Sequence, residues 1–458
     1  MLQTFKNAWK VRELRNKILF TLMIILLYRI GATLFVPFVD VTLLDNMSTI
    51  MSGSIFQFLN TLSGNAFKNG TFFALSVSPY ITASIVMQLL TIALPPLERL
   101  SKQGEEGKKK IAAYTRIVTV ALALLTSWGY VELLNSSGAL VVSKLDGNFY
   151  YFQLAVMMAC FCAGASLVMW LAEKINDHGI GNGISIILFA NIISDASTQV
   201  GQMKSMLQTT QPIMINGITY PGYETVYMTG WPLVLGILKV VLSVALAILA
   251  VGLIVWFTNS ERRIPIQYAK RVVGRKMYGG QSSNLPLKMN MAGVMPVIFA
   301  SSIVSLPATV ANFFTKENWF TKFVNNWFSY TSIAYIVVFM ILLFAFSYFY
   351  IMISFNPIEV ANNIRSNGGS IPGIRPGKPT SDYIKKVLNR VTLVGAVFLG
   401  VIAGVPMIAN AIFVKFNISF ATIAFTGTSL LIVVGVALET VRELEAQLSM
   451  RNYKGFLD

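Results

Sequence analysis

Ten long apolar runs dominate this 458-residue sequence and exclude a soluble globular fold. They cover residues 18–37, 72–95, 111–134, 152–172, 183–197, 232–258, 289–313, 333–355, 391–411 and 420–438. A helix needs about 20 apolar residues to cross a bilayer, and most of the runs reach that length, although the fifth is short. Charged residues make up only 12% of the chain and the mean hydropathy is +0.63. The pattern predicts an all-α polytopic membrane protein with ten transmembrane helices.

The distribution of basic residues predicts the orientation. Most of the 36 lysines and arginines fall on the side of the membrane that holds the N-terminus. The few in the opposite loops are Lys68, Lys144, Lys204, Lys316, Lys322 and Lys415. Because cytoplasmic loops carry the excess of basic residues, both termini are predicted to be cytoplasmic. No cleavable signal peptide is expected, since a full-length span follows the basic N-terminus.

Residues 54–70 differ from the ten runs. They mix apolar with small and polar side chains and are too short and too polar to cross a bilayer, and Gly70 separates them from the second span. Non-helical backbone at membrane depth is tolerated only where protein or a water-filled cavity receives it. We therefore interpret this stretch as a re-entrant segment that fills, lines or closes something. The alternative is an amphipathic helix on the outer membrane interface.

Two loops on the predicted cytoplasmic side, residues 259–288 and 356–390, are long, basic and rich in glycine and proline. Such loops are expected to project as ordered arms that dock a large acidic partner, either protein or RNA; ordinary lipid-facing loops are the alternative. The piece GIRPGKPT does not fit a phosphate-binding loop, because only three residues separate Gly373 from Gly377 and Pro379 replaces the required serine or threonine. No ATPase is predicted.

The spans also lack the residues of a coupled transporter or an enzyme. Ion- and proton-coupled transporters place carboxylates or histidine near the midplane, but the carboxylates here are expected near span ends, and Arg29 is the one charge well inside a span. Cys160 and Cys162 lie two residues apart in one apolar run and are expected to be free thiols, and His178 alone cannot form a metal site. No metal or cofactor is predicted. A water-excluding aliphatic constriction remains possible.

Five multi-residue motifs carry a resemblance to a known family. They are SPYITASIVMQLL (78–90), HGIGNGISIILFA (178–190), NMAGVMPVIFASS (290–302), IPGIRPGKPTSDYI (371–384) and GTSLLIVVGVALET (427–440). These resemble the SecY family, the pore subunit of the bacterial protein-translocation channel, in order and with the family's ten spans. The tail LETVRELEAQLSMRNYKGFL is similar to Gram-positive members.

The resemblance implies two five-helix halves in inverted pseudo-symmetry, residues 1–197 and 231–440, joined by an external hinge loop at 198–230 and followed by a cytoplasmic tail at 441–458. Residues 54–70 resemble the family's plug, which caps a closed pore. The plug residues carried over are Phe56, Phe58, Leu59, Asn60, Leu62, Ser63, Gly64 and Asn65.

The resemblance also implies an aliphatic pore ring and a lateral gate. The ring positions are Ile81, Ile85, Leu188, Ile192, Ile298 and Ile432. The second and third spans would face the seventh and eighth across the gate, where polar side chains could form weak interhelical hydrogen bonds. These side chains are Gln88, Thr91, Ser302, Ser305 and Thr309. For each of these positions, ordinary helix packing is the alternative.

By resemblance the chain is a passive conduit, without cofactor, in the bacterial plasma membrane. Energy would come from the SecA motor ATPase or a ribosome docked on the arms, with SecE clamping the halves and SecG alongside. Secretory and membrane preproteins would be the substrates, membrane lipid a further partner, and DNA none. The residues expected to dock partners are Arg262, Arg263, Lys270, Arg271, Arg375 and Lys378. The alternative functions are a small-solute transporter and a membrane-embedded enzyme.

Overall fold

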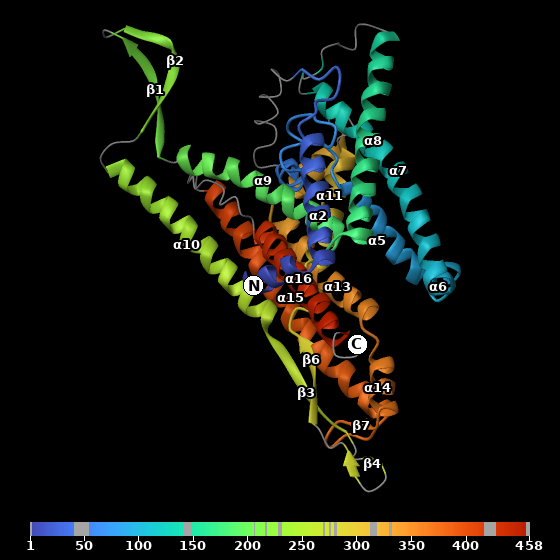
Figure 1. Ribbon diagram of the computed structural model, residues 1–458. Coiled ribbons are helices and arrows are strands. Elements are labelled where there is room, and N and C mark those ends of the chain that lie inside the picture. The colour runs from blue at the N-terminus through green and yellow to red at the C-terminus, as the bar shows by residue number, and fades with distance from the viewer. Residues whose placement is uncertain are drawn as a thin grey trace.

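The computed structural model places a helix on each of the ten predicted spans (Figure 1). The structure describes residues 2–40, 55–136, 138, 140, 148–205, 207–215, 218–227, 231–268, 271–273, 276–278, 282–311, 318–328, 332–415 and 427–454. The ten helices are α2 (Arg12–Gly31), α5 (Ser78–Ala93), α7 (Glu105–Ser136), α8 (Asn148–His178), α9 (Gly183–Ser205), α10 (Trp231–Asn259), α11 (Met295–Ala311), α13 (Ile333–Ser354), α15 (Lys378–Lys415) and α16 (Gly427–Lys454). Residues 420–426 of the tenth predicted span lie outside the described residues.

Length and composition alone qualify fewer helices as membrane-crossing. Among the described residues, five helices pass such a test, and a sixth passes if α5 and the following α6 (Pro95–Ser101) count as one span bent by 103°. The bend lies at Leu94, which is extended because prolines 95 and 96 follow it. α9 and α11 are apolar but shorter.

The prediction of one helix over residues 72–95 is wrong in its first part. Residues 72–77 form turns, and α5 begins only at Ser78, with Pro79 in its first turn. Proline suits this position because its missing N–H would have no partner there. The turn residues Phe73, Leu75 and Val77 are nevertheless buried. These residues are therefore apolar because protein buries them. The sequence pattern, in contrast, predicts part of a helix that crosses the lipid.

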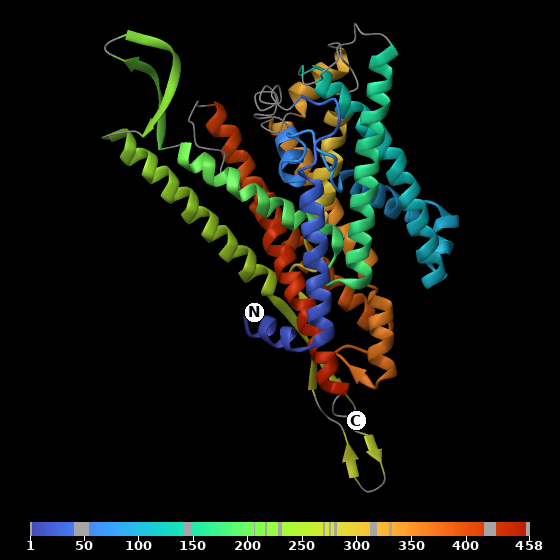
Figure 2. The same cartoon turned by 45° about the horizontal axis from the view of Figure 1, so that its top comes forward.

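One hydrophobic core joins helices from both ends of the sequence. It takes buried side chains from α2, α5, α9, α11, α13, α15 and α16. A second core lies between α7 and α8, where Tyr130 packs edge-on against Phe161 at 5.0 Å. α10 differs from the helices of these two cores. It diverges from the bundle in both views (Figures 1 and 2), and only 17% of its most apolar 18-residue segment is buried.

The two basic loops form one ordered unit at one end of the molecule. β3 (Glu261–Tyr268) pairs with β6 (Ser282–Lys288) and with the short β7 (Gly369–Ser370) of the second loop, which also holds α14 (Pro357–Ser366). The small strands β4 (Arg271–Val273) and β5 (Lys276–Tyr278) extend the first hairpin. Ile264, Leu287, Ile364 and Ile384 are buried together beneath the sheet. We call this unit the basic platform.

The opposite end carries the predicted hinge loop. α9 continues to Ser205, and a two-stranded antiparallel hairpin, β1 (Gln208–Ile215) and β2 (Ile218–Tyr227), follows before α10. The remaining short helices are α1 (Leu2–Lys10), α4 (Ile55–Ser63) and α12 (Trp319–Trp327). In Figure 1 the hairpin and the basic platform lie at opposite ends of the helices.

Candidate functional site

Six aliphatic side chains from four helices belong to the main core. They are the ring positions Ile81 and Ile85 on α5, Leu188 and Ile192 on α9, Ile298 on α11 and Ile432 on α16. None is more than 3% exposed. On α5 and on α9 the two positions are four residues apart and therefore share one helix face. Buried aliphatic side chains are expected in a closed constriction and equally in an ordinary helix core. The ring therefore stays a prediction.

Part of residues 54–70 packs beside this region. α4 contacts α9, and its last residues, Leu62 and Ser63, are buried. Immediately after α4 the chain reverses through two left-handed residues, Gly64 (φ +62°) and Asn65 (φ 71°). Gly64 is required for space as well, since a Cβ there would lie 2.7 Å from the Arg29 guanidinium and 3.0 Å from the Asn191 side chain. Phe56 and Phe58 lie on α4, but their side chains fall outside the described residues.

Asn191, on α9 one turn beyond the ring position Leu188, holds the end of α4. Its amide nitrogen donates to the Leu62 carbonyl at 2.7 Å and to the Tyr28 hydroxyl at 2.8 Å, with a longer contact to Ser76 at 3.3 Å. Asn191 is fully buried. Its carbonyl oxygen accepts from the Arg29 guanidinium at 3.3 Å. Arg29 therefore points toward α9 within the bundle.

A second contact ties the turn to the same helix. The Asn65 amide donates to an Asp195 carboxylate oxygen at 3.0 Å, four residues beyond Asn191. Asp195 is buried near the end of the apolar part of α9, and the helix continues past it to Ser205. Asn60 keeps the turn compact, since its side chain donates to Asn65 and accepts from the Lys68 backbone, both at 2.8 Å. Asn191 and Asp195 bond directly to residues 62–65, and Tyr28 and Arg29 bond to Asn191; we call this set of contacts the latch.

The latch was not predicted from the sequence. Of its residues, Leu62, Ser63, Gly64 and Asn65 were named as plug residues, and Asn191 and Tyr28 were not considered. One signal was present: Asn191 is a polar residue one turn from Leu188 inside an otherwise apolar run. A buried amide in such a place needs hydrogen-bond partners.

A cavity of about 220 Å³ lies beside the latch. Its walls come from α4, α5, α7 and α11 and include the predicted gate residues Ser302, Ser305 and Thr309. Gln88 and Thr91 lie on α5 but do not line it. α11 contacts both α5 and α7.

The expected interhelical hydrogen bonds between gate side chains are not formed within the described residues. Gln88 donates to Ser84, and Thr91 to the Met87 carbonyl. On α11, Ser305 donates to the Ser302 carbonyl and Thr309 to the Ser305 carbonyl. Serine and threonine in helices commonly bond back to their own backbone in this way. The helices therefore meet at this cavity through side-chain packing.

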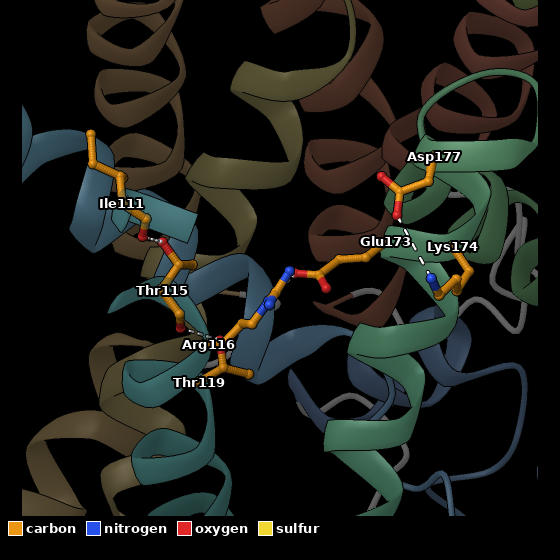
Figure 3. Close-up of polar contacts among 7 residues, drawn as sticks. All are labelled: Ile111, Thr115, Arg116, Thr119, Glu173, Lys174 and Asp177. Carbon is orange, nitrogen blue, oxygen red and sulfur yellow. Dashed lines mark hydrogen bonds and ion pairs between the residues drawn. The ribbon is translucent and has the colours of Figure 1, made fainter. Parts of the chain in front are cut away.

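The carboxylate at the end of α8 has a structural partner. Glu173 accepts from the Arg116 guanidinium of α7 at 2.9 Å, and Lys174 lies 4.0 Å from Asp177 one turn on (Figure 3). The pair joins the two helices where the sequence places their cytoplasmic ends. Cys160 and Cys162 are free, and no cluster of three metal-binding side chains occurs in the part of the chain that the structure describes.

The basic platform presents most of the predicted docking residues to solvent. Arg262, Arg263 and Lys378 are exposed, although Arg263 pairs with Glu261 at 2.6 Å. Arg375 is exposed in a turn between two left-handed glycines, Gly373 (φ 78°) and Gly377 (φ 104°), and the Thr380 hydroxyl fixes its carbonyl at 2.9 Å. Arg271 lies on β4 with its side chain outside the described residues, and Lys270 falls outside them entirely.

Comparison with known proteins decides the family. The SecY family model matches residues 71–441. The chain is 42% identical to the protein translocase subunit SecY of Streptomyces coelicolor and 40% identical to that of Mycobacterium bovis, in each case over all of both chains. The chain belongs to the SecY family.

Solved structures show the same architecture. One, described as the structure of a protein conducting channel, superposes with a TM-score of 0.61 at 16% identity and covers 94% of this chain and 92% of that one. Another, with a TM-score of 0.59, is described by its plug domain, which stabilises the closed state and maintains a membrane seal. The protein thus has the all-α polytopic fold of a protein-conducting channel, and SecY family membership makes it a channel subunit of a protein translocase and not an enzyme.

Proposed function

We propose that residues 54–70 are the plug of this channel, that the latch holds it closed, and that the six aliphatic positions form the constriction. The observation that carries the proposal is the hydrogen bond from Asn191 to the Leu62 carbonyl, because it joins the end of α4 to a helix that bears two ring positions. Secretory polypeptides would pass through the ring once the plug leaves. An aliphatic constriction excludes water and ions when closed.

The proposed gate lies at the 220 Å³ cavity between α5, α7 and α11. The described gate side chains bond within their own helices. Separating α11 from α5 and α7 therefore breaks packing contacts between these residues. A transmembrane segment could then leave for the lipid there. The proposed division into halves at 1–197 and 231–440 makes the β1–β2 hairpin part of the hinge.

The proposed orientation places the basic platform and both termini in the cytoplasm of a bacterium. Solved relatives of this fold include Sec61 in a ribosome–channel complex, with a TM-score of 0.56 at 14% identity. For this chain we propose that a ribosome or the SecA motor docks on the platform through Arg375 and its basic neighbours. SecE and SecG are the proposed partner subunits, and the exposed face of α10 leaves room for such contacts.

A reversible lock on the plug tests this function. In a chain with Cys160 and Cys162 replaced, Asn65→Cys and Asp195→Cys place thiols at two side chains that now touch. Joining them with a short, cleavable thiol crosslinker should stop precursor transport into vesicles, and cleavage should restore it. Each single-cysteine variant is the control.

Undiminished precursor transport through the locked chain would show that residues 54–70 do not obstruct the path. Proton-gradient-driven accumulation of a small solute, with no precursor transport in any variant, would favour the transporter alternative. Loss of transport in the single-cysteine controls would identify a folding defect; the latch variants described in the Discussion then test the plug without cysteines.

A further inference from the structure

α12 occupies a defined place at one end of the bundle. It joins α11 to α13. Since the platform strand β6 precedes α11 and the platform helix α14 follows α13, α12 lies at the end of these two helices that is remote from the platform. It contacts both α11 and α13. At its start the Thr321 hydroxyl accepts from the Asn318 backbone N–H at 2.9 Å, which fixes where the helix begins.

One side of α12 packs on the protein. Val324 is buried in the main core, the same core that holds the six ring positions, and Phe320 packs partly against it. Thr321, on the same side, is also buried. The helix is therefore a fixed part of the fold, and its remaining faces have a defined direction.

A second face presents a ladder of exposed aromatic rings. Trp319, Phe323 and Trp327 are spaced four residues apart, which places them on one face of the helix. They are 80%, 39% and 55% exposed. Adjacent rings are stacked, with centroids 5.6 Å and 6.1 Å apart. Lys322 is also exposed but points in a different direction. At roughly 100° per residue, it lies about 60° around the helix from Trp319, on the side away from Phe323, and so about 100° from Phe323.

The next helix along the chain, α13, carries an exposed apolar stripe. α13 is a membrane-crossing helix by length and composition, and it begins six residues after α12 ends. Its first three turns expose Ile333, Val337 and Ile341, again four residues apart. An apolar stripe on the outside of a transmembrane helix faces acyl chains. Tryptophan is enriched where acyl chains meet headgroups, because its ring is apolar and its N–H is polar.

We propose that α12 is an interfacial anchor that inserts Trp319, Phe323 and Trp327 into the headgroup–acyl boundary of the lipid. The partner is the membrane surface itself, and the anchor fixes the depth of the adjoining ends of α11 and α13. α11 bears Ser302, Ser305 and Thr309 at the cavity, so one wall of that cavity is tied to the lipid through α12. This proposal needs only the membrane location and does not depend on the plug or the ring.

Spin labels measure the insertion directly. In a chain lacking Cys160 and Cys162, a single cysteine replaces Phe323, and a second chain carries Lys322→Cys as the matched control one residue away. Each labelled protein is placed in nanodiscs of mixed zwitterionic and anionic lipid. We expect the label at 323 to collide mainly with oxygen, which concentrates in lipid, and the label at 322 to collide mainly with a water-soluble nickel complex.

Two results would overturn the anchor. Equal nickel accessibility at 322 and 323 would place the aromatic face in water, and shielding of the 323 label from both reagents would mean that protein covers it. If the cysteine variants do not fold, the native side chains provide the second measurement. Lipids brominated near the headgroup should quench the tryptophan emission of the native chain more than that of Trp319→Phe/Trp327→Phe, and an unchanged quenched fraction would overturn the proposal.

Discussion

At the scale of single residues, the proposed latch on the plug centres on Asn191. Asn191→Leu keeps the branched shape and the number of heavy atoms of the side chain. It removes the donors to the Leu62 carbonyl and the Tyr28 hydroxyl and the acceptor for Arg29. Leaving a buried partner unsatisfied costs about 1–3 kcal/mol, which corresponds to roughly a fivefold to 150-fold shift between two states. We expect ion conductance of the unoccupied channel in planar bilayers to rise within that range.

A control variant at the start of the same helix distinguishes loss of the latch from a general loss of helix stability. Asn182 accepts from the Ile184 and Ser185 backbone N–H groups at the start of α9 and does not touch residues 62–65. Asn182→Ala should cost about 1 kcal/mol of helix stability without raising conductance. Equal conductance increases in the two variants would contradict the latch.

Substitutions of Arg375 distinguish the effect of its charge from the effect of its side-chain geometry. Its turn is fixed by two left-handed glycines and by Thr380, so the guanidinium is presented from a rigid support. An arginine fork pairs bidentately with carboxylate or phosphate, which lysine cannot reproduce. We expect Arg375→Lys to weaken partner-driven precursor transport several-fold and Arg375→Glu to nearly abolish it, with normal membrane levels.

Arg365 provides the matched control for that charge change. It lies on α14 in the same loop and is also exposed. If Arg365→Glu reduces transport as much as Arg375→Glu does, then the net charge of the platform decides docking and the geometry of Arg375 does not.

At the scale of elements, Arg442 joins α16 to the end of α10, from which the first strand of the platform continues. Its guanidinium donates to the Thr258 carbonyl at 2.7 Å and to the Asn259 side chain at 2.9 Å, at the last residues of α10. A cation suits this place because the final carbonyls of a helix lack partners. Lys288, at the end of β6, lies nearby: burial lowers its pKa, and the charge of Arg442 lowers it further.

Removing this contact should loosen the attachment of the first hairpin. Hydrogen bonds to charged groups contribute about 1.5–3 kcal/mol. In Arg442→Ala we expect backbone amides of the last turn of α10 and the start of β3 to exchange at least tenfold faster, as measured by hydrogen–deuterium exchange. Arg442→Lys should fall between. Unchanged exchange there, with faster exchange elsewhere, would show that Arg442 does not hold the hairpin.

The helices were largely predictable because lipid imposes a composition on any span that it surrounds. Prediction was wrong at residues 72–77 because these residues are apolar for a different reason, namely burial among other helices as turns. The sheet of the basic platform joins strands about 100 residues apart, β3 and β7, so no local pattern could reveal it. The latch was missed for the same reason, since Asn191 and Leu62 meet only when α9 packs against α4.

At the scale of the whole molecule, the main core contains the six ring positions. Polar substitutions there should have opposite effects depending on whether these residues form an ordinary core or a pore seal. Replacing Ile81, Ile85, Ile298 and Ile432 by asparagine in a true core would create buried unsatisfied amides and lose packing, at about 2–5 kcal/mol for each truncated side chain. Such a protein would not accumulate in the membrane. In a constriction, water enters instead and hydrates the amides.

We therefore expect the fourfold variant to assemble, to transport precursor, and to conduct ions at least tenfold better than the parent chain when idle. Leu343 and Phe339 on α13 and Leu399 on α15 belong to the same core, are equally buried, and are not ring positions. Asparagine at these three control positions should abolish accumulation, since nothing there is expected to admit water. Membrane levels and conductance measured side by side distinguish the two sets. Loss of the fourfold variant from the membrane, in step with the control set, would show that the six positions are core and that the seal lies elsewhere.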